Sequence, residues 1–201
     1  MAEPGGALAS RRDVLLERAG HLFAARGFRG VSVHEIGAAA GITGPGIYRH
    51  FPSKEALLGA VLVSISERLL AGGRLLVDRH EGAEPDPAAA LEALEALVEF
   101  HTDFALDHPE LITVQDREFA HLPAEDRHRV RRLQRAYVEI WVDALRAATP
   151  GLADDVARTA VHATFGLLNS TPHSASRPVL GRAETATLLR RIALGALRAA
   201  M

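Results

Sequence analysis

The stretch that most constrains the fold of this chain is SVHEIGAAAGITGPGIYRHFPSK, which begins at Ser32. Ser32 and Glu35 have capping-box spacing, in which a hydroxyl and a carboxylate satisfy backbone N–H groups left free at a helix start. Gly41 supplies the left-handed residue that commonly ends a helix. Thr43 is a candidate N-cap for a second helix, and Pro45 suits an early helical position because it has no N–H to leave unpaired. The stretch therefore predicts two short helices joined by a tight turn.

The apolar residues of this stretch indicate how the two short helices pack. Ile36 and Ala40 lie one turn apart, and the small residues between them allow another helix to approach closely. Ile47 and Phe51, also one turn apart, are expected to anchor the second helix, which leaves Tyr48 directed elsewhere. This layout predicts a helix-turn-helix, in which one helix supports and the other places its N-terminal end in the major groove of DNA.

The run GITGPGIYRHFPSKEALL closely resembles the signature of the TetR family of bacterial transcriptional regulators, G-[IV]-[ST]-x-x-x-[IL]-Y-x-[HY]-F-x-[SN]-K-E. The matching residues are Gly41, Ile42, Thr43, Ile47, Tyr48, His50, Phe51, Ser53, Lys54 and Glu55. The alternative is a dinucleotide-binding loop at Gly44-Pro45-Gly46. That alternative has little support, because no strand precedes the glycines and Arg49 stands where a third glycine belongs.

Composition and charge limit the classes of protein that remain. The 201 residues, 48% of them hydrophobic, are enough for one mid-sized domain or a small domain fused to a larger one. Cysteine is absent, so disulfides and thiolate metal sites are excluded. The N-terminus lacks a leader pattern and no later apolar run reaches membrane-spanning length, so we expect a cytoplasmic protein without a membrane partner. The formal net charge is −2, but seven basic and four acidic residues up to Lys54 give that part +3, and the remainder carries −5.

The rest of the chain shows helical periodicity and no sustained alternation, so we expect an all-α protein of about nine helices. The resemblance implies a disordered N-terminus over residues 1–9, a helix-turn-helix DNA-binding domain over 10–54, and a ligand-binding and dimerisation domain over 55–201. Apolar spacing, glycines and prolines predict further helices at about 10–26, 53–80, 109–122, 124–148, 154–169 and 183–200, and one that opens at the segment 84–87 and contains Leu91 to Leu106.

The expected DNA contacts lie at the N-terminal ends of the two short helices, where free N–H groups and the helix dipole favour phosphates. These residues are Ser32, Val33, His34, Thr43, Gly44, Pro45 and Gly46. The resemblance adds Tyr48 and His50 as phosphate clamps, Lys54 as a phosphate contact, and Arg49 as a phosphate or guanine contact. Packing within the small helix-turn-helix domain is the alternative role for these residues. Gly44 and Gly46 have no side chains where many relatives carry base readers, so a helical interaction module or a degenerate regulator is the alternative function.

The resemblance implies that the C-terminal domain binds a small hydrophobic ligand. The large aromatic residues of the middle helices are the candidate ligand contacts. They are Phe100, Phe104, Phe119, Tyr137, Trp141 and Phe165; ordinary core packing is the alternative for each. Arg127, Arg131 and Arg135 form a stripe on one helix, which is either a solvated face or a site for an anionic ligand. DREFAHLP followed by this helix resembles TetR members that control lipid and acyl-CoA catabolism, so an acyl-CoA is one candidate ligand.

Metal and cofactor sites are not expected. His101, His108 and His162 are considered as metal ligands, but none forms an i, i+4 pair of histidines and no carboxylate set accompanies them. Nucleophile–base spacings and phosphate-binding loops are also missing from the sequence, so the chain is not expected to be an enzyme.

The last two predicted helices are apolar on more than one side and rich in small residues, which is typical of a helical dimer interface. The candidate contacts are Val161, Thr164, Leu168, Leu188, Ile192 and Ala196. Taken together, the sequence predicts a homodimeric repressor that binds a palindromic operator in double-stranded DNA. A small molecule that binds the C-terminal domain is expected to release it.

Overall fold

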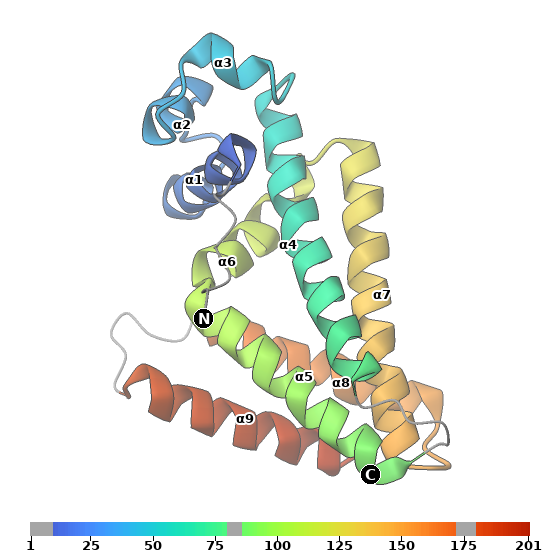
Figure 1. Ribbon diagram of the computed structural model, residues 1–201. Helices are drawn as coiled ribbons and strands as arrows, with labels where there is room; N and C mark the ends of the chain where they lie inside the picture. Colours follow the sequence, from blue (N-terminus) through green and yellow to red (C-terminus); the bar gives the residue numbers. More distant parts are fainter. Residues whose placement is uncertain (1–9, 80–85, 172–179) are drawn as a thin grey trace, which may run out of the picture.

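The computed structural model describes residues 10–79, 86–171 and 180–201, and within these ranges the chain is helical without strands. The predicted disordered segment 1–9 lies outside the described residues. Figure 1 shows a small head of three helices at one end of a longer helical body. The helices are α1 (Arg11–Arg26), α2 (Val33–Ala39), α3 (Gly44–Tyr48), α4 (Lys54–Asp78), α5 (Pro87–Asp107), α6 (Pro109–Glu118), α7 (Ala124–Ala148), α8 (Asp154–Asn169) and α9 (Arg182–Arg198), with a 3-10 turn at Phe119–His121.

Local capping sets the ends of the head helices. The Ser10 hydroxyl accepts from the Asp13 N–H at 3.2 Å, and the Ser32 hydroxyl accepts from the Glu35 N–H at the same distance. In both cases the acidic side chain accepts from the backbone N–H of the serine, which completes the predicted capping boxes. Gly41 follows α2 with φ of 66°, as predicted. Thr43 is the N-cap of α3, but its side chain makes no capping hydrogen bond.

The head is held together by close packing between α2 and α3. Ile36 and Ile47 are buried, and Phe51 is also nearly inaccessible to solvent. A Cβ added to Gly37 would lie 2.8 Å from Ile47 Cδ1 and 2.6 Å from the Ile42 carbonyl oxygen. Only a residue without a side chain fits there, which confirms the predicted close approach of the two short helices.

Helix α4 runs from the head into the body and belongs to both hydrophobic clusters. Leu57, Leu62 and Ile65 lie in the cluster that includes the head core, whereas Leu70 lies in the cluster of the body. By length and composition α4 is able to cross a membrane, so the expectation that no run reaches that length was wrong. Most of its apolar side chains between Leu57 and Leu70 are instead buried against neighbouring helices, as in the core helix of a soluble protein.

Two adjacent glycines let α5 and α7 pack directly on α4. A Cβ at Gly72 would overlap the ring of Phe100 on α5. A Cβ at Gly73 would lie 2.7 Å from Cε2 of Tyr137 on α7, and both Gly73 and Tyr137 are buried. The Gly72-Gly73 pair therefore serves as a docking surface for two aromatic rings.

Helices α5 and α9 lie side by side (Figure 1). A series of ion pairs joins them. The acidic residues on α5 are Glu95, Glu99, Asp103 and Asp107, spaced by four, and their partners on α9 are Arg198, Arg190 and Arg182. The distances lie between 2.7 and 3.2 Å. The acidic residues recur every four positions along α5, and the arginines recur every eight positions along α9. Successive pairs therefore align the two helices in antiparallel register.

We predict that Gly73→Ala lowers the free energy of unfolding by about 1–2 kcal/mol. The added methyl group forces the buried Tyr137 ring to move, and this cost exceeds the gain in helix propensity. Urea denaturation followed by circular dichroism measures the change. Ser64→Ala, at an exposed position of the same helix, is the control and should have little effect. A Gly73→Ala protein as stable as the wild type would show that the contact is not tight.

Candidate functional site

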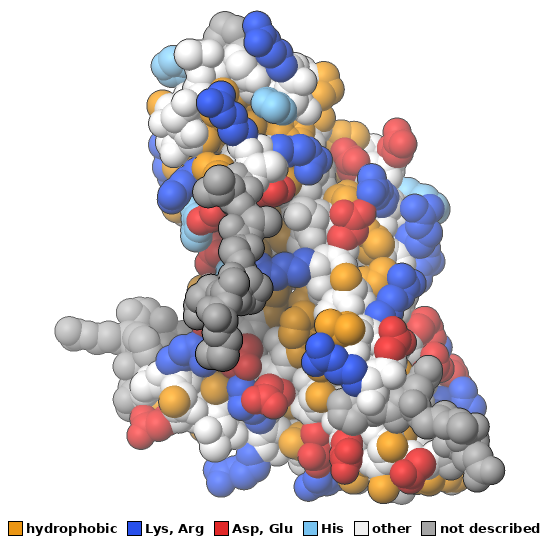
Figure 2. Space-filling view, in the orientation of Figure 1, with side chains coloured by type: hydrophobic (Ala, Val, Ile, Leu, Met, Phe, Trp, Pro, Cys, Tyr) orange, Lys and Arg blue, Asp and Glu red, His pale blue; other side chains and the backbone are white. Residues whose placement is uncertain are grey.

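The surface of α2 and α3 contains most of the predicted DNA contacts. Tyr48 is 56% exposed, and Arg49 and His50 are also exposed beside it. At the other helix starts Ser32, His34 and Thr43 are exposed, whereas Val33 is half-buried against the head core. The backbone of Gly44 and Pro45 forms the start of α3. On the face drawn in Figure 2, Lys and Arg side chains stand out over this end of the molecule.

Lys54 has a packing role that the sequence prediction did not include. Its Nζ donates to the carbonyl oxygens of Phe28 and Val31, each at 2.9 Å, and lies 4.3 Å from the centre of the Phe28 ring. Two of the three ammonium donors are therefore used to hold the start of α4 against the loop between α1 and α2.

A second charged group fixes the position of α2. Glu35 accepts hydrogen bonds from the N–H and hydroxyl of Ser32, and Arg26 Nη1 donates to Glu35 at 2.8 Å. The hydrogen bonds from Ser32 and then the one from Arg26 lower the pKa of Glu35 to about 2. Glu35 is thus ionised at neutral pH and ties α2 to the end of α1.

The body contains a cavity of about 230 Å³ between α4, α5, α6, α7 and α8. Its apolar lining consists of Leu69, Tyr137, Val138 and Phe165. Its polar lining consists of Ser66, His101, Gln115, Gln134, His162 and Asn169. Because His162 is exposed, the cavity reaches the surface at that residue. A concave site with an aromatic wall and a few polar groups is typical of a small-molecule pocket.

His101 is at the centre of a hydrogen-bonded series within this cavity. Its Nε2 lies 2.9 Å from Asn169 Oδ1, and its Nδ1 lies 3.4 Å from the Tyr137 hydroxyl. Burial lowers the pKa of His101 to about 4, so the imidazole is neutral at pH 7 with one donor and one acceptor. The Nε2–H therefore donates to Asn169, and the Tyr137 hydroxyl, whose own pKa burial raises, donates to Nδ1.

The aromatic residues predicted to bind a ligand are only partly brought together. Tyr137 and Phe165 line the cavity, and Trp141 is fully buried with its ring centre 4.8 Å from that of Phe165. Phe100, Phe104 and Phe119 do not line it. Their rings instead pack on Gly72, under Arg68 and under Arg131, respectively.

The polar residues of the cavity were missed as ligand contacts by the sequence analysis. The available signal was a polar side chain on the apolar face of a helix, since His101 follows Leu94, Leu97 and Val98 at helical spacing on the buried face of α5. A similar argument does not identify Gln115 or Gln134, because half-buried glutamines are common on amphipathic helices.

The arginine stripe of α7 does not line the cavity. Arg127 Nη2 donates to the Leu122 carbonyl at 2.8 Å and so fixes the turn before α7. Arg131 lies 5.3 Å from the centre of the Phe119 ring, and Arg135 is exposed. Arg131 precedes the cavity residue Gln134 by three positions, so the two share one face of the helix.

The predicted dimer contacts on α8 require a correction. Val161, Thr164 and Leu168 are fully buried inside the single chain and cannot contact a second subunit. They lie on the inner face of α8, whereas the outer face carries Val156, which is 44% exposed, and the exposed small residues Ala163 and Gly166. The predicted contacts on α9 are more accessible to solvent than those on α8. Leu188, Ile192 and Ala196 lie at i, i+4 and i+8, and Ile192 and Ala196 are exposed while Leu188 is half-buried.

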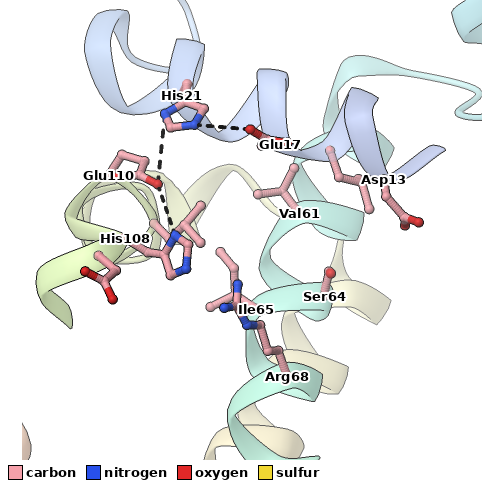
Figure 3. A pocket seen from close by; sticks show the side chains of 12 residues that line it. Asp13, Glu17, His21, Val61, Ser64, Ile65, Arg68, His108 and Glu110 are labelled. Atoms are coloured by element: carbon pink, nitrogen blue, oxygen red, sulfur yellow. Dashed lines mark ion pairs between the residues drawn. The ribbon is translucent and has the colours of Figure 1, made fainter. Parts of the chain in front are cut away.

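A second cavity, of about 460 Å³, lies at the junction of head and body (Figure 3). Here Glu110 of α6 lies between two histidines, with His21 Nδ1 of α1 at 3.9 Å and His108 Nδ1 at 3.7 Å from its Oε1. Leu111 Cδ2 lies 3.0 Å from the position that a Cβ of Gly20 would take. The N-terminal end of α6 is therefore seated on α1 of the head.

Neither histidine-containing region forms a metal site. Within residues 10–79, 86–171 and 180–201, no group of three His, Asp or Glu side chains is placed to hold a metal ion.

Two family models match the chain. The family described as "Bacterial regulatory proteins, tetR family" matches residues 15–61, and "Tetracyclin repressor-like, C-terminal domain" matches residues 87–173. The HTH-type transcriptional repressor KstR2 of Mycobacterium tuberculosis is 32% identical over 152 residues, which cover 72% of this chain and 70% of that protein. The chain belongs to the TetR family. It is therefore a ligand-responsive, DNA-binding transcriptional regulator.

Two solved structures of other regulators illustrate the same fold. The ketosteroid transcriptional regulator KstR2 of Mycobacterium tuberculosis has a TM-score of 0.72 at 25% identity, covering 96% of this chain and 97% of that one. AibR, solved in complex with isovaleryl coenzyme A and operator DNA, has a TM-score of 0.71 at 22% identity, covering 91% and 97%. At 22% identity, the similarity to AibR shows only that the two proteins share a fold.

We predict that this TetR-family protein loses stability in weak acid through His101. Its pKa is about 4 in the folded state and near 6.5 when unfolded, so the unfolded chain binds more protons between these values. The free energy of unfolding should fall by roughly 2 kcal/mol between pH 7 and pH 5 from this residue alone. Urea denaturation at the two pH values measures it.

In a His101→Gln variant that part of the pH dependence should disappear, whereas His34→Gln, at an exposed position, should retain it. Equal pH dependence in His101→Gln and the wild type would contradict the assignment of a buried neutral imidazole.

Proposed function

We propose that this protein is a homodimeric repressor that leaves a palindromic operator when a small molecule enters the 230 Å³ cavity of the body. The observation that carries the proposal is that α6 contacts both functional regions. Gln115 lines the cavity, while Glu110 and Leu111 of the same helix lie against α1 of the head. A ligand that displaces Gln115 therefore acts on an element seated on the DNA-binding head.

The direction of this response depends on differential binding. DNA is released only if the ligand binds the head arrangement that does not fit the operator more tightly than the one that does. Coupling of about 1–3 kcal/mol, typical of such systems, changes the affinity for DNA by roughly 5- to 150-fold. A shift of α6 along its packed surfaces is sufficient to produce this coupling, since packed interfaces switch between discrete arrangements.

The DNA contacts that we propose are residues 32–34 at the start of α2, residues 43–46 at the start of α3, and residues 48–50 at its end. The exposure of Tyr48, Arg49 and His50 supports phosphate contacts, because no buried role competes with them. Lys54 contributes less to DNA binding, because only one of its three ammonium donors is left to bind a phosphate. Few side chains remain to distinguish base pairs, so DNA shape and backbone contacts carry a large share of the recognition.

The dimer that we propose forms through the outer faces of α8 and α9. The apolar stripe on α9 supports it, with Ile192 and Ala196 exposed and Leu188 half-buried, and so do the exposed Val156 and Gly166 on α8. Two such helices from each subunit form a four-helix bundle about a two-fold axis. Two-fold symmetry presents two heads to the two halves of a palindrome.

For the ligand we propose an acyl-CoA whose acyl end enters the cavity. A volume of about 230 Å³ is smaller than most ligand sites, which span about 300–1,000 Å³, so the nucleotide part lies outside. Arg131, on the same face of α7 as Gln134, and the exposed Arg135 are the cations available to its phosphates. AibR, which has the same fold, has been solved with isovaleryl coenzyme A, and this supports the choice of ligand to test first.

The test of the DNA-binding function uses the DNA upstream of the protein's own coding region. The wild type should bind it with an affinity that falls steeply as salt rises, because phosphate contacts release counterions. Tyr48→Ala should weaken binding about tenfold, the cost of one hydrogen bond to a charged phosphate. Fluorescence anisotropy with labelled DNA measures both.

The matched control is Leu75→Ala, at a 52% exposed apolar position on α4 far along the helix from the head. It should bind DNA like the wild type. Weak binding that is indifferent to DNA sequence, or unchanged binding by Tyr48→Ala, would argue against this use of the head.

We also predict that Ile192→Glu converts the dimer to monomers. Burying a carboxylate in an apolar interface should raise the dimer dissociation constant at least roughly a hundredfold. Light scattering at micromolar concentration should give the 21.6 kDa mass of one chain for the variant and twice that for the wild type. Leu75→Glu is the control. A wild type of monomeric mass would contradict the proposal.

A further inference from the structure

We infer that the body cavity recognises an uncharged carbonyl group of its ligand and rejects a carboxylate. The inference rests on the proposed function, because it takes the 230 Å³ cavity as the ligand site. It adds the chemical class of the group that is recognised and the side chains that recognise it.

The described residues that line the cavity include polar groups but no fixed charge. None of these described residues is Asp, Glu, Lys or Arg. A carboxylate that entered would lose its hydration and meet no cation among them, which is strongly unfavourable. A neutral amide, ketone or thioester loses far less on leaving water.

His101 does not supply the missing positive charge. It is 3% exposed, and both ring nitrogens are already engaged, Nε2 with Asn169 and Nδ1 with Tyr137. Four aromatic rings, those of Phe104, Tyr137, Trp141 and Phe165, lie within 6.4 Å of its ring centre and exclude water from it. The imidazole therefore remains neutral and acts as a fixed dipole of the wall.

Two carboxamides are free to bind a ligand. Gln115 on α6 and Gln134 on α7 are half-buried and line the cavity, and their side chains make no hydrogen bond with a described residue. Each carboxamide offers N–H donors to a carbonyl oxygen and an acceptor to an N–H or hydroxyl. Half-buried polar groups without partners are favourable points for a ligand to bind, because pairing them recovers the cost of their desolvation.

Pairs of molecules with the same shape and different charge test the inference. Benzamide is compared with benzoate, and cyclohexanecarboxamide with cyclohexanecarboxylate, at pH 8. Fluorescence of Trp141, the single tryptophan of the chain, reports binding, since its ring contacts Phe165 on the cavity wall. Each amide should bind saturably and at least tenfold more tightly than its acid.

Two substitutions at Gln134 separate recognition from general packing. Gln134→Leu keeps the size of the side chain and should weaken amide binding about tenfold. Gln134→Lys adds a cation to the lining and should reverse the preference, so that benzoate binds more tightly than benzamide. Circular dichroism establishes that both variants are folded, and Leu75→Ala is the control that should bind like the wild type.

Tighter binding of the acids by the wild type would overturn the inference, as would the lack of a saturable response to both amides. The result is independent of the DNA experiment. A protein that binds operator DNA but prefers acids would lose only this inference. A protein that binds amides but no specific DNA would lose only the proposed regulatory function.

Discussion

Burial of α4 is the constraint on which the rest of the structure depends. The N-terminal half of this helix completes the core of the head, and its C-terminal half forms one wall of the body. The head cluster also includes Ile112, Val114 and Val130 from α6 and α7, so no layer of solvent separates head from body. A helix held by two clusters transmits displacement along its length, because neither cluster can be rearranged without moving it.

Two cavities with polar lining residues interrupt this apolar core. At the head–body junction Glu110 and two histidines line a cavity beside α1, and deeper in the body three carboxamides and the neutral imidazole of His101 line another. Helix α6 runs from one to the other. In the function proposed above, its short length and its seat on Gly20 let α6 pass the effect of a ligand in the inner cavity to the head. The same reasoning requires that operator DNA alter the inner cavity, since coupling between two binding sites is reciprocal.

Most of the fold was predictable from the sequence, because the signals that set helix ends are local. Capping boxes at Ser10 and Ser32 and the left-handed Gly41 placed the ends of the head helices within a residue or two. The inner and outer faces of α8 were not predictable in the same way. Its residues are small or apolar on more than one side, so periodicity did not show that Val161 faces the core and Gly166 the solvent.

The candidate sites were predictable only where a motif carried them. The head residues followed from the signature around Tyr48, which occupies one continuous stretch. The cavity draws single residues from five helices, and its composition depends on how α4 to α8 pack. Large aromatics were a poor guide, since Phe100 and Phe104 fill space between helices elsewhere. The ion pairs between α5 and α9 were likewise hidden, because their partners are more than seventy residues apart.

Hydrogen–deuterium exchange with and without operator DNA tests most directly whether α6 couples head and cavity. If it does, DNA bound at the head changes the exchange rates of amides in residues 109–118, including that of Gln115 in the cavity wall, as well as those of the head. Changes confined to residues 32–54, with α6 unaffected, would contradict the account, because the head would then bind DNA without any effect on the body.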